Sequence, residues 1–155
     1  MVEAVNAIEL KNITKRFGTK VVANDKVNLT LRKGEILSLL GENGSGKTTL
    51  LKSIIGLLGT NSGSIHLDDV DVTKMKPYER SKAGIAYVPQ GREIIPQLTV
   101  KENLELGALA HNVNFEEKAK EIFEYFPVLT QHLKRKGGVL SGGQQQQLAI
   151  ARALM

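Results

Sequence analysis

The nine residues from Gly41 to Thr49, GENGSGKTT, constrain the fold more than any other part of this sequence. They fit the pattern G-x-x-x-x-G-K-[ST], in which glycines let backbone N–H groups turn inward around an anion. An apolar run, Ile36 to Leu40, precedes the pattern, and apolar residues recur at helical spacing from Thr48 to Leu58. The sequence therefore predicts a strand, a glycine-rich loop and a helix in succession, with the strand buried on both faces as in a parallel sheet.

The residue types in this loop suit the phosphates of a nucleoside triphosphate. A helix that begins near Lys47 directs the positive end of its dipole at a bound anion. We expect Lys47 to reach the β- and γ-phosphates and the hydroxyl of Thr48 to bind Mg²⁺. The alternative is a glycine-rich turn that binds nothing, and the flanking strand and helix argue against it. The residues predicted to hold the nucleotide are Gly41, Glu42, Asn43, Gly44, Ser45, Gly46, Lys47, Thr48 and Thr49.

The other segments of residues 1–90 have the pattern of short strands. Apolar and polar residues alternate around Ile8 to Leu10 and from Val27 to Leu31, which predicts half-buried strands. Two further apolar segments, Ser64 to Leu67 and Gly84 to Val88, are also predicted as strands.

Residues 91–155 have the pattern of helices. Thr99 and Glu102 form a capping box that opens a helix through about Ala110, and Asn114 is placed to cap another. Ser141, with Gln144 three residues later, opens a helix that continues to the end of the sequence. We therefore expect a mixed α/β part followed by a helical part.

The composition excludes several classes of protein. Cysteine is absent, so there is no disulfide framework, thiolate metal site or cysteine nucleophile. No segment resembles a signal peptide or has the length of a membrane span. The net charge of +5 is dispersed and aromatic residues make up only 5% of the chain, so nucleic acid is not an expected partner. The three histidines, His66, His111 and His132, lack metal-ligand spacing and are interpreted as surface or structural residues.

Two further motifs give the chain a resemblance to a known family. Residues Leu140 to Gln144, LSGGQ, resemble the signature motif of ABC-type ATPases, and Gln90 resembles their Q-loop glutamine. The order of P-loop, Q-loop, helical segment and signature is similar to that family over essentially the whole chain. The resemblance implies an α/β P-loop NTPase fold: a RecA-like core with N-terminal antiparallel β-strands (1–90) and an α-helical signature subdomain (91–155).

The resemblance also implies roles for individual residues. Phe17 lies where the family places an aromatic residue that stacks on adenine, although tyrosine is more usual there. Lys47 and Gln90 would act in ATP hydrolysis, and Thr48 and Gln90 would hold Mg²⁺. The signature residues Ser141, Gly142, Gly143 and Gln144 would contact ATP held by a second ATPase subunit in a head-to-tail dimer. Apart from the resemblance, a capped helix start with two glycines is itself suited to an anion.

The subtype is suggested by two segments. GIAYVPQG at 84–91, with the residues up to Val100, is similar to ATPases of importers for branched-chain amino acids and urea. LSGGQQQQLAIARAL at 140–154 is close to the urea type, whereas Ile95 and Gln97 depart from its usual phenylalanine and arginine. The implied partners are transmembrane permease subunits and, indirectly, a solute-binding protein, and the implied location is cytoplasmic, peripheral on the inner face of the cell membrane. Ile94 and Ile95 either receive a coupling helix of the permease or pack inside the helical part.

Family members continue after the signature helix with a strand that ends in Asp-Glu and, later, a histidine. This sequence stops at Met155 inside a predicted helix, so we expect a portion of a longer ATPase with impaired hydrolysis and an uncovered apolar strand at Ile36 to Leu40. A second hypothesis is a non-hydrolytic module in which ATP joins two copies. A DNA-repair ABC ATPase is disfavoured because residues 91–139 lack sustained heptads. A GTPase is disfavoured because no N-K-x-D motif follows the P-loop.

Overall fold

The computed structural model describes residues 6–155 and divides the chain into two compact units, Met1–Ile85 and Ala86–Met155. The expectation that no signal peptide is present rests partly on residues 1–5, which lie outside the described residues. Within the described range, no helix combines the length and the apolar character needed to cross a membrane.

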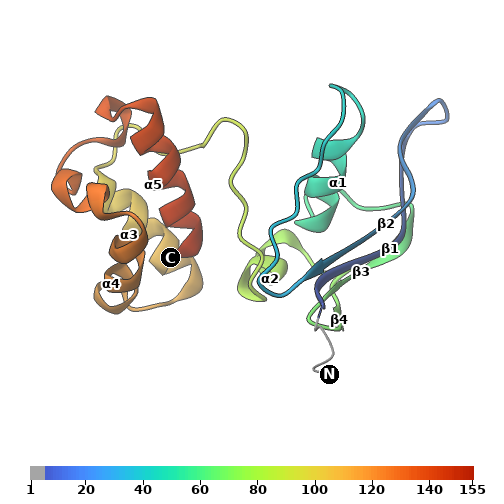
Figure 1. Ribbon diagram of the computed structural model, residues 1–155, viewed down its shortest axis with the longest axis horizontal. Coiled ribbons are helices and arrows are strands. Elements are labelled where there is room, and N and C mark those ends of the chain that lie inside the picture. Colours follow the sequence, from blue (N-terminus) through green and yellow to red (C-terminus); the bar gives the residue numbers. More distant parts are fainter. Residues whose placement is uncertain (1–5) are drawn as a thin grey trace. The chain divides into compact units, whose positions relative to one another are not determined.

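An antiparallel sheet forms the framework of the first unit (Figure 1). Its strands are β1 (Asn6–Phe17), β2 (Val21–Arg32), β3 (Ser62–Leu67) and β4 (Val70–Asp71), in the order β2-β1-β3-β4. The strands predicted around Ile8, Val27 and Ser64 are therefore confirmed. Alternation predicts them well because one face of each strand is buried and the other is solvated.

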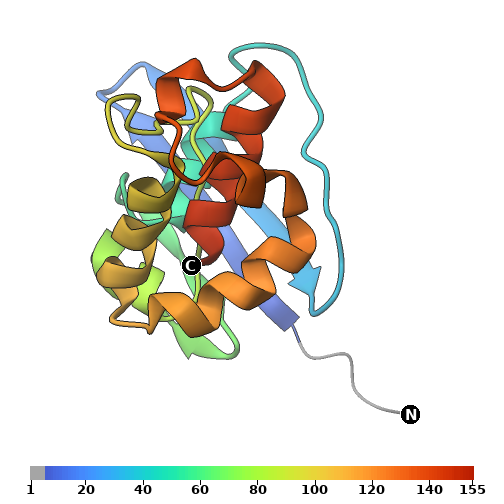
Figure 2. The same cartoon turned by 90° about the vertical axis from the view of Figure 1, so that its left-hand side faces the viewer.

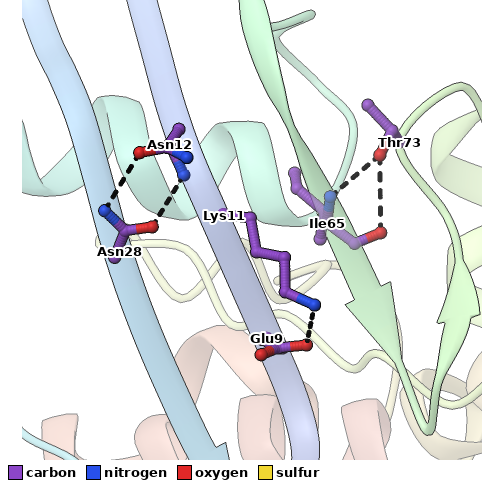
Figure 3. Close-up of polar contacts among 6 residues, drawn as sticks. All are labelled: Glu9, Lys11, Asn12, Asn28, Ile65 and Thr73. Atoms are coloured by element: carbon purple, nitrogen blue, oxygen red, sulfur yellow. Dashed lines mark hydrogen bonds and ion pairs between the residues drawn. The ribbon is translucent and has the colours of Figure 1, made fainter.

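Side-chain hydrogen bonds link neighbouring strands of the sheet, and one pair of them lies where the pairing of β1 with β2 is irregular (Figure 3). Asn12 has a left-handed φ of 51°, and its backbone N–H donates to Oδ1 of Asn28 at 2.9 Å. The Asn28 amide donates back to Oδ1 of Asn12 at 3.3 Å. On the other side of β1, the Ile65 N–H donates to the Thr73 hydroxyl at 2.8 Å. Asparagine suits the bulge because its short polar side chain tolerates this backbone conformation.

Helix α1 (Lys47–Ile54) packs on one face of this sheet (Figure 1). Leu50 and Ile54 of the helix join Leu10, Ile13 and Ile65 of the strands in one buried cluster. Burying each such side chain contributes about 1.5–3 kcal/mol. The packing fixes the helix, and with it the loop that precedes Lys47. A short helix, α2 (Pro77–Lys82), completes the unit.

Two predicted strands are absent from the structure. Ile36 to Leu40 and Gly84 to Val88 have no regular secondary structure, and both predictions were wrong. A strand requires a hydrogen-bonded neighbour, and in residues 6–155 no strand pairs with either segment. Ile36 and Leu40 are instead 95% and 90% exposed, so the apolar surface predicted for this segment is uncovered in the described structure.

Helices make up the second unit, as Figure 2 shows. They are α3 (Val100–His111), α4 (Phe115–Tyr125), α5 (Gly142–Leu154) and the 3₁₀ turns η1 (Pro127–His132) and η2 (Gly137–Val139). The three predicted caps are confirmed, since Thr99, Asn114 and Ser141 each accept a hydrogen bond from the backbone N–H three residues later.

The core of this unit lies between α3, α4 and α5 and includes Leu104, Ile122 and Leu148. Ile94 packs against this core, whereas Ile95 is 37% exposed. Asn103 is fully buried and holds the loop before α3. Its Oδ1 accepts from the Ile95 N–H at 2.9 Å, and its Nδ2 donates to carbonyl oxygens of Ile95, Leu98 and Thr99.

The cap of α3 predicts an acid-sensitive helix start. The Thr99 N–H and hydroxyl both donate to the Glu102 carboxylate at 2.7 Å and lower its pKa below the ordinary 4.5. A lowered pKa stabilises the fold above pH 4.5, and this contribution is lost as the pH falls through the lowered value. We expect amide protection in the first turn of α3, corrected for intrinsic exchange, to fall in acid. Glu102→Gln should remove this dependence, and an unchanged acid response in that variant would contradict the assignment.

Candidate functional site

The glycine-rich loop leads directly into α1, as predicted. Gly44 and Gly46 have φ values of 86° and 89°, and Gly46 is the N-cap of the helix in the left-handed region. A Cβ at Gly46 would lie against the carbonyl oxygen of Ala23 and 2.8 Å from Nδ2 of Asn24. Glycine is therefore required there both by backbone conformation and by the close approach of β2.

Asn24 of β2 holds the end of the loop by a hydrogen bond to the backbone of Gly46. It is buried, and its Nδ2 donates to the Gly46 carbonyl at 3.3 Å. Its Oδ1 is buried without a hydrogen-bond partner among the described residues. The amide thus joins the strand to the start of α1, a contact between residues 22 positions apart that sequence spacing does not reveal.

The Lys47 ammonium lies within the loop. It donates to the carbonyl oxygens of Gly41 and Glu42, each at 2.7 Å, and contacts Oγ of Ser45 at 3.2 Å. The Ser45 N–H donates to the Glu42 carbonyl at 3.2 Å, which tightens the turn. A positive charge is therefore held at the N-terminus of α1, where the helix dipole already favours an anion.

The loop and the β1–β2 hairpin enclose one cleft with a volume of about 360 Å³. Phe17, at the end of β1, forms an apolar wall with Val21 and Val22, and these three side chains are 44–56% exposed. The ammonium of Lys15 lies 5.3 Å from the Phe17 ring centroid. The remaining lining residues come from β2, the loop and α1: Ala23, Asn43, Gly44, Gly46, Lys47, Thr48 and Thr49.

This cleft fits a nucleotide chemically. Its apolar wall offers an aromatic face to a base, and the loop and Lys47 offer N–H groups and a cation to phosphates. Thr48 is exposed at the cleft, and its hydroxyl is the kind of hard oxygen ligand that Mg²⁺ accepts. Phe17 and the loop residues are thus brought together in the first unit, whereas Gln90 and the signature belong to the second.

Gln90 lies in a turn that is attached to α5 at two points. Arg92, with a φ of 63°, donates through Nη1 to Oε1 of Gln145 at 3.0 Å. Arg152 donates through Nη2 to the carbonyl of Glu93, whose φ is 51°, at 2.6 Å. Two consecutive left-handed residues are strained, and such backbone persists where its surroundings hold it. Sequence analysis missed Arg92 and Arg152 because no motif marks these contacts.

The signature opens α5 through a reciprocal capping box. The Gln144 N–H donates to Oγ of Ser141 at 3.3 Å, and the Ser141 N–H donates to Oε1 of Gln144 at 3.0 Å. Gly142 and Gly143 occupy the first turn and are exposed. The Gln144 side chain also contacts His132, whose role sequence analysis did not define beyond surface or structure.

Comparisons with known proteins find relatives that cover most of this chain. The sequence model of the ABC transporter family matches residues 24–155. The chain is 44% identical to "Probable branched-chain amino acid transport ATP-binding protein LivF" of Archaeoglobus fulgidus, covering 83% of this chain and 55% of that protein. It is 37% identical to "High-affinity branched-chain amino acid transport ATP-binding protein BraG" of Pseudomonas aeruginosa, covering 88% of this chain and 59% of that protein. The chain thus spans between half and two thirds of these relatives.

A solved structure shares the fold. The ADP conformation of MJ1267, an ATP-binding cassette of an ABC transporter, superposes with a TM-score of 0.83 at 32% identity, covering 96% of this chain and 64% of that one. The predicted fold class is therefore confirmed: an α/β P-loop NTPase of the cassette type, with an antiparallel N-terminal sheet and a helical part that carries the LSGGQ sequence.

Proposed function

Because this chain belongs to the ABC transporter family, we propose that it is the ATP-binding, energy-coupling part of an importer. The observation that carries the proposal is the cleft in which Phe17 and the loop around Lys47 face a common space. In that cleft, the side chain of Phe17 stacks on adenine, and the backbone of Gly41 to Thr49 surrounds the phosphates.

Each phosphate-binding residue has a separate task in this proposal. Lys47 moves its ammonium from the carbonyls of Gly41 and Glu42 toward the phosphates, where it neutralises negative charge. The Thr48 hydroxyl would hold Mg²⁺, and the resemblance also gives Gln90 a role toward the metal and the transferred phosphoryl group. Mg²⁺, when bound, supplies charge stabilisation to the phosphates.

The signature forms the second half of a composite site. Ser141, Gly142, Gly143 and Gln144 begin a capped helix of 13 residues, α5, whose positive end can meet an anion. We propose that this end meets the phosphate held by the P-loop of a second ATPase subunit. Two such sites related by two-fold symmetry give a head-to-tail dimer with ATP at the interface.

Two parts of the chain divide these tasks. We propose that residues 1–90, a range that ends five positions after the first compact unit at Ile85, are the N-terminal part of the ATP-binding core and that residues 91–155 are the helical signature subdomain. The importer would carry urea or branched-chain amino acids. The LSGGQQQQLAIARAL segment supports urea, and the similarity to LivF and BraG supports amino acids. The proposed partners are permease subunits in the membrane and, indirectly, a solute-binding protein. The chain would contact the permease from the cytoplasmic face.

We expect the 155-residue chain to bind ATP but not to hydrolyse it above the background rate. We propose that no residue of 1–155 polarises the attacking water, because the resemblance places that glutamate on a strand after the signature helix. We expect saturable ATP binding with phosphate release at the background rate. Steady-state turnover well above background would contradict this impairment. The second hypothesis, a module that uses ATP only to join two copies, predicts the same low turnover even when the chain is part of a longer protein.

Phe17 provides a test of base recognition. Loss of one base–aromatic stack costs about 1–3 kcal/mol, so Phe17→Ala should weaken ATP binding about 5- to 150-fold. Phe17→Tyr should bind like the wild type. Inorganic triphosphate, which has no base, should bind Phe17→Ala and wild type equally, and titration calorimetry measures both ligands. Equal losses for ATP and triphosphate would show that Phe17 shapes the loop and does not stack on the base. Tyr78→Ala, at an exposed aromatic residue outside the cleft, is the matched control.

A further inference from the structure

The signature glutamine has a second partner that its motif does not predict. Oε1 of Gln144 accepts from the Ser141 N–H at 3.0 Å, which fixes the orientation of the amide and leaves Nε2 on its other side. Nε2 lies 3.1 Å from Nε2 of His132, at the end of η1. The capping box is therefore continued into the loop before the signature.

The chemistry of this contact specifies the state of the imidazole ring. The Gln144 amide NH₂ and the Arg135 guanidinium can only donate, and a neutral imidazole has one acceptor nitrogen; we assign the acceptor to Nε2 of His132, which lies closer to its donor. A neutral imidazole then bears its proton on Nδ1. Nη1 of Arg135 lies 3.4 Å from Nδ1, so two donors face each other there, at the longer of the two distances on either side of the ring.

A protonated ring would not make this contact. The imidazolium has two donors and no acceptor, so both of its contacts, with Nε2 of Gln144 and with Nη1 of Arg135, would be donor to donor. It would also place a second positive charge beside Arg135. The groups in polar contact with the ring are thus a cation from its own loop and a neutral amide from α5, while Lys134 and Lys136 add positive charge to the loop.

We propose that His132 is a positioning residue of the signature: its neutral imidazole holds the Gln144 amide in the orientation that closes the capping box. This inference rests on the proposed function for the importance of the signature. Through the Gln144 side chain, the ring also fixes the half of the box in which the Ser141 N–H donates to Oε1 of Gln144; the other half runs from the Gln144 N–H to Oγ of Ser141. Protonation of His132 releases the amide and loosens the first turn of α5.

The test follows the Gln144 side chain by NMR in the nucleotide-free 155-residue chain, from pH 8 to pH 5, where histidines titrate. The chemical shifts of the Gln144 Nε2 group should change with pH over the same range as the chemical shifts of the His132 ring. Protection of the Ser141 backbone amide, which donates to Oε1 of Gln144, should fall roughly two- to fivefold on the acid side after correction for intrinsic exchange, as expected for partial loss of a cap.

Two variants separate positioning from packing. His132→Gln supplies an acceptor that does not titrate, so it should keep the protection seen at pH 8 and make it independent of pH. His111→Gln, at the end of α3, should leave the Gln144 curve unchanged. The proposal is overturned if Gln144 is insensitive to pH while the His132 ring titrates, or if His132→Gln retains the wild-type curve. Because no nucleotide is present, either result is independent of whether the cleft binds ATP, and the wild-type titration decides alone if a variant does not fold.

Discussion

Replacement of Lys47 by alanine is expected to weaken Mg-ATP binding about 10- to 100-fold. Hydrogen bonds to charged groups contribute about 1.5–3 kcal/mol, and each 1.4 kcal/mol is tenfold in affinity. Lys47 carries the ammonium held at the start of α1, where it contacts the carbonyls of Gly41 and Glu42. The alanine variant removes this cation from the cleft and leaves the loop glycines in place. Titration calorimetry with Mg-ATP measures the loss.

A matched control separates a local contact from general charge. Lys52 lies in the last turn of the same helix and is absent from the cleft lining. Lys52→Ala therefore removes the same charge from α1 and should change the affinity less than twofold, by the rule that screened surface charges contribute little. Equal affinities for the Lys47→Ala variant and the wild type would contradict the proposal that the loop binds Mg-ATP. A comparable loss in both variants would indicate that net charge, and not the loop, attracts the nucleotide.

Arg80 is expected to give the largest effect on stability. Its side chain is buried at 3% exposure, and four backbone carbonyls surround it. Nη1 donates to Ser53 and Ile54 at 2.7 Å each, Nη2 to Thr73 at 2.7 Å, and Nε to Met75 at 3.1 Å. Burial lowers the pKa of this guanidinium and Asp71 opposes the shift, and arginine stays protonated in proteins. A cation thus caps the C-terminus of α1, where the helix dipole is negative.

Arg80→Met should lower the free energy of unfolding by about 3–5 kcal/mol, because it leaves buried carbonyls without donors. Arg80→Lys should recover only part of this loss, since one ammonium cannot form the planar fork of a guanidinium. Urea denaturation of the 155-residue chain measures both variants. Lys82→Met, at an exposed position in the last turn of the same short helix, should stay within about 0.5 kcal/mol of wild type. An Arg80→Met midpoint equal to that of Lys82→Met would contradict the assigned role.

The elements that sequence analysis predicted correctly are those with local causes. The caps at Thr99, Asn114 and Ser141 depend on residues three positions apart, and the structure has all three. The loop before Lys47 is likewise read from contiguous residues. By contrast, Ile36 to Leu40 was predicted as a strand, and an apolar run becomes a strand only when a neighbour pairs with it. The described residues provide no such neighbour.

The parts of the candidate site that sequence analysis missed depend on long-range contacts. Asn24 of strand β2 donates to the carbonyl of Gly46 at the start of α1, and Arg92 donates to Gln145, 53 positions away. His132 was interpreted only as surface or structural because metal spacing was the signal sought, whereas its contact with Gln144 follows from how η1 meets α5. Sequence analysis did not predict a role for Arg80 either. Its four partners are backbone carbonyls, which no residue type in the sequence marks as partners of a cation.

The most direct test of nucleotide binding in this cleft is a titration of the wild-type chain with Mg-ATP, followed by two-dimensional NMR of the backbone amides. The account predicts saturable binding at one site, with the largest shifts at the loop residues from Gly41 to Thr49 and at Phe17, which line or adjoin the cleft. Saturable binding with its shifts elsewhere, or no binding at millimolar ATP, would contradict it.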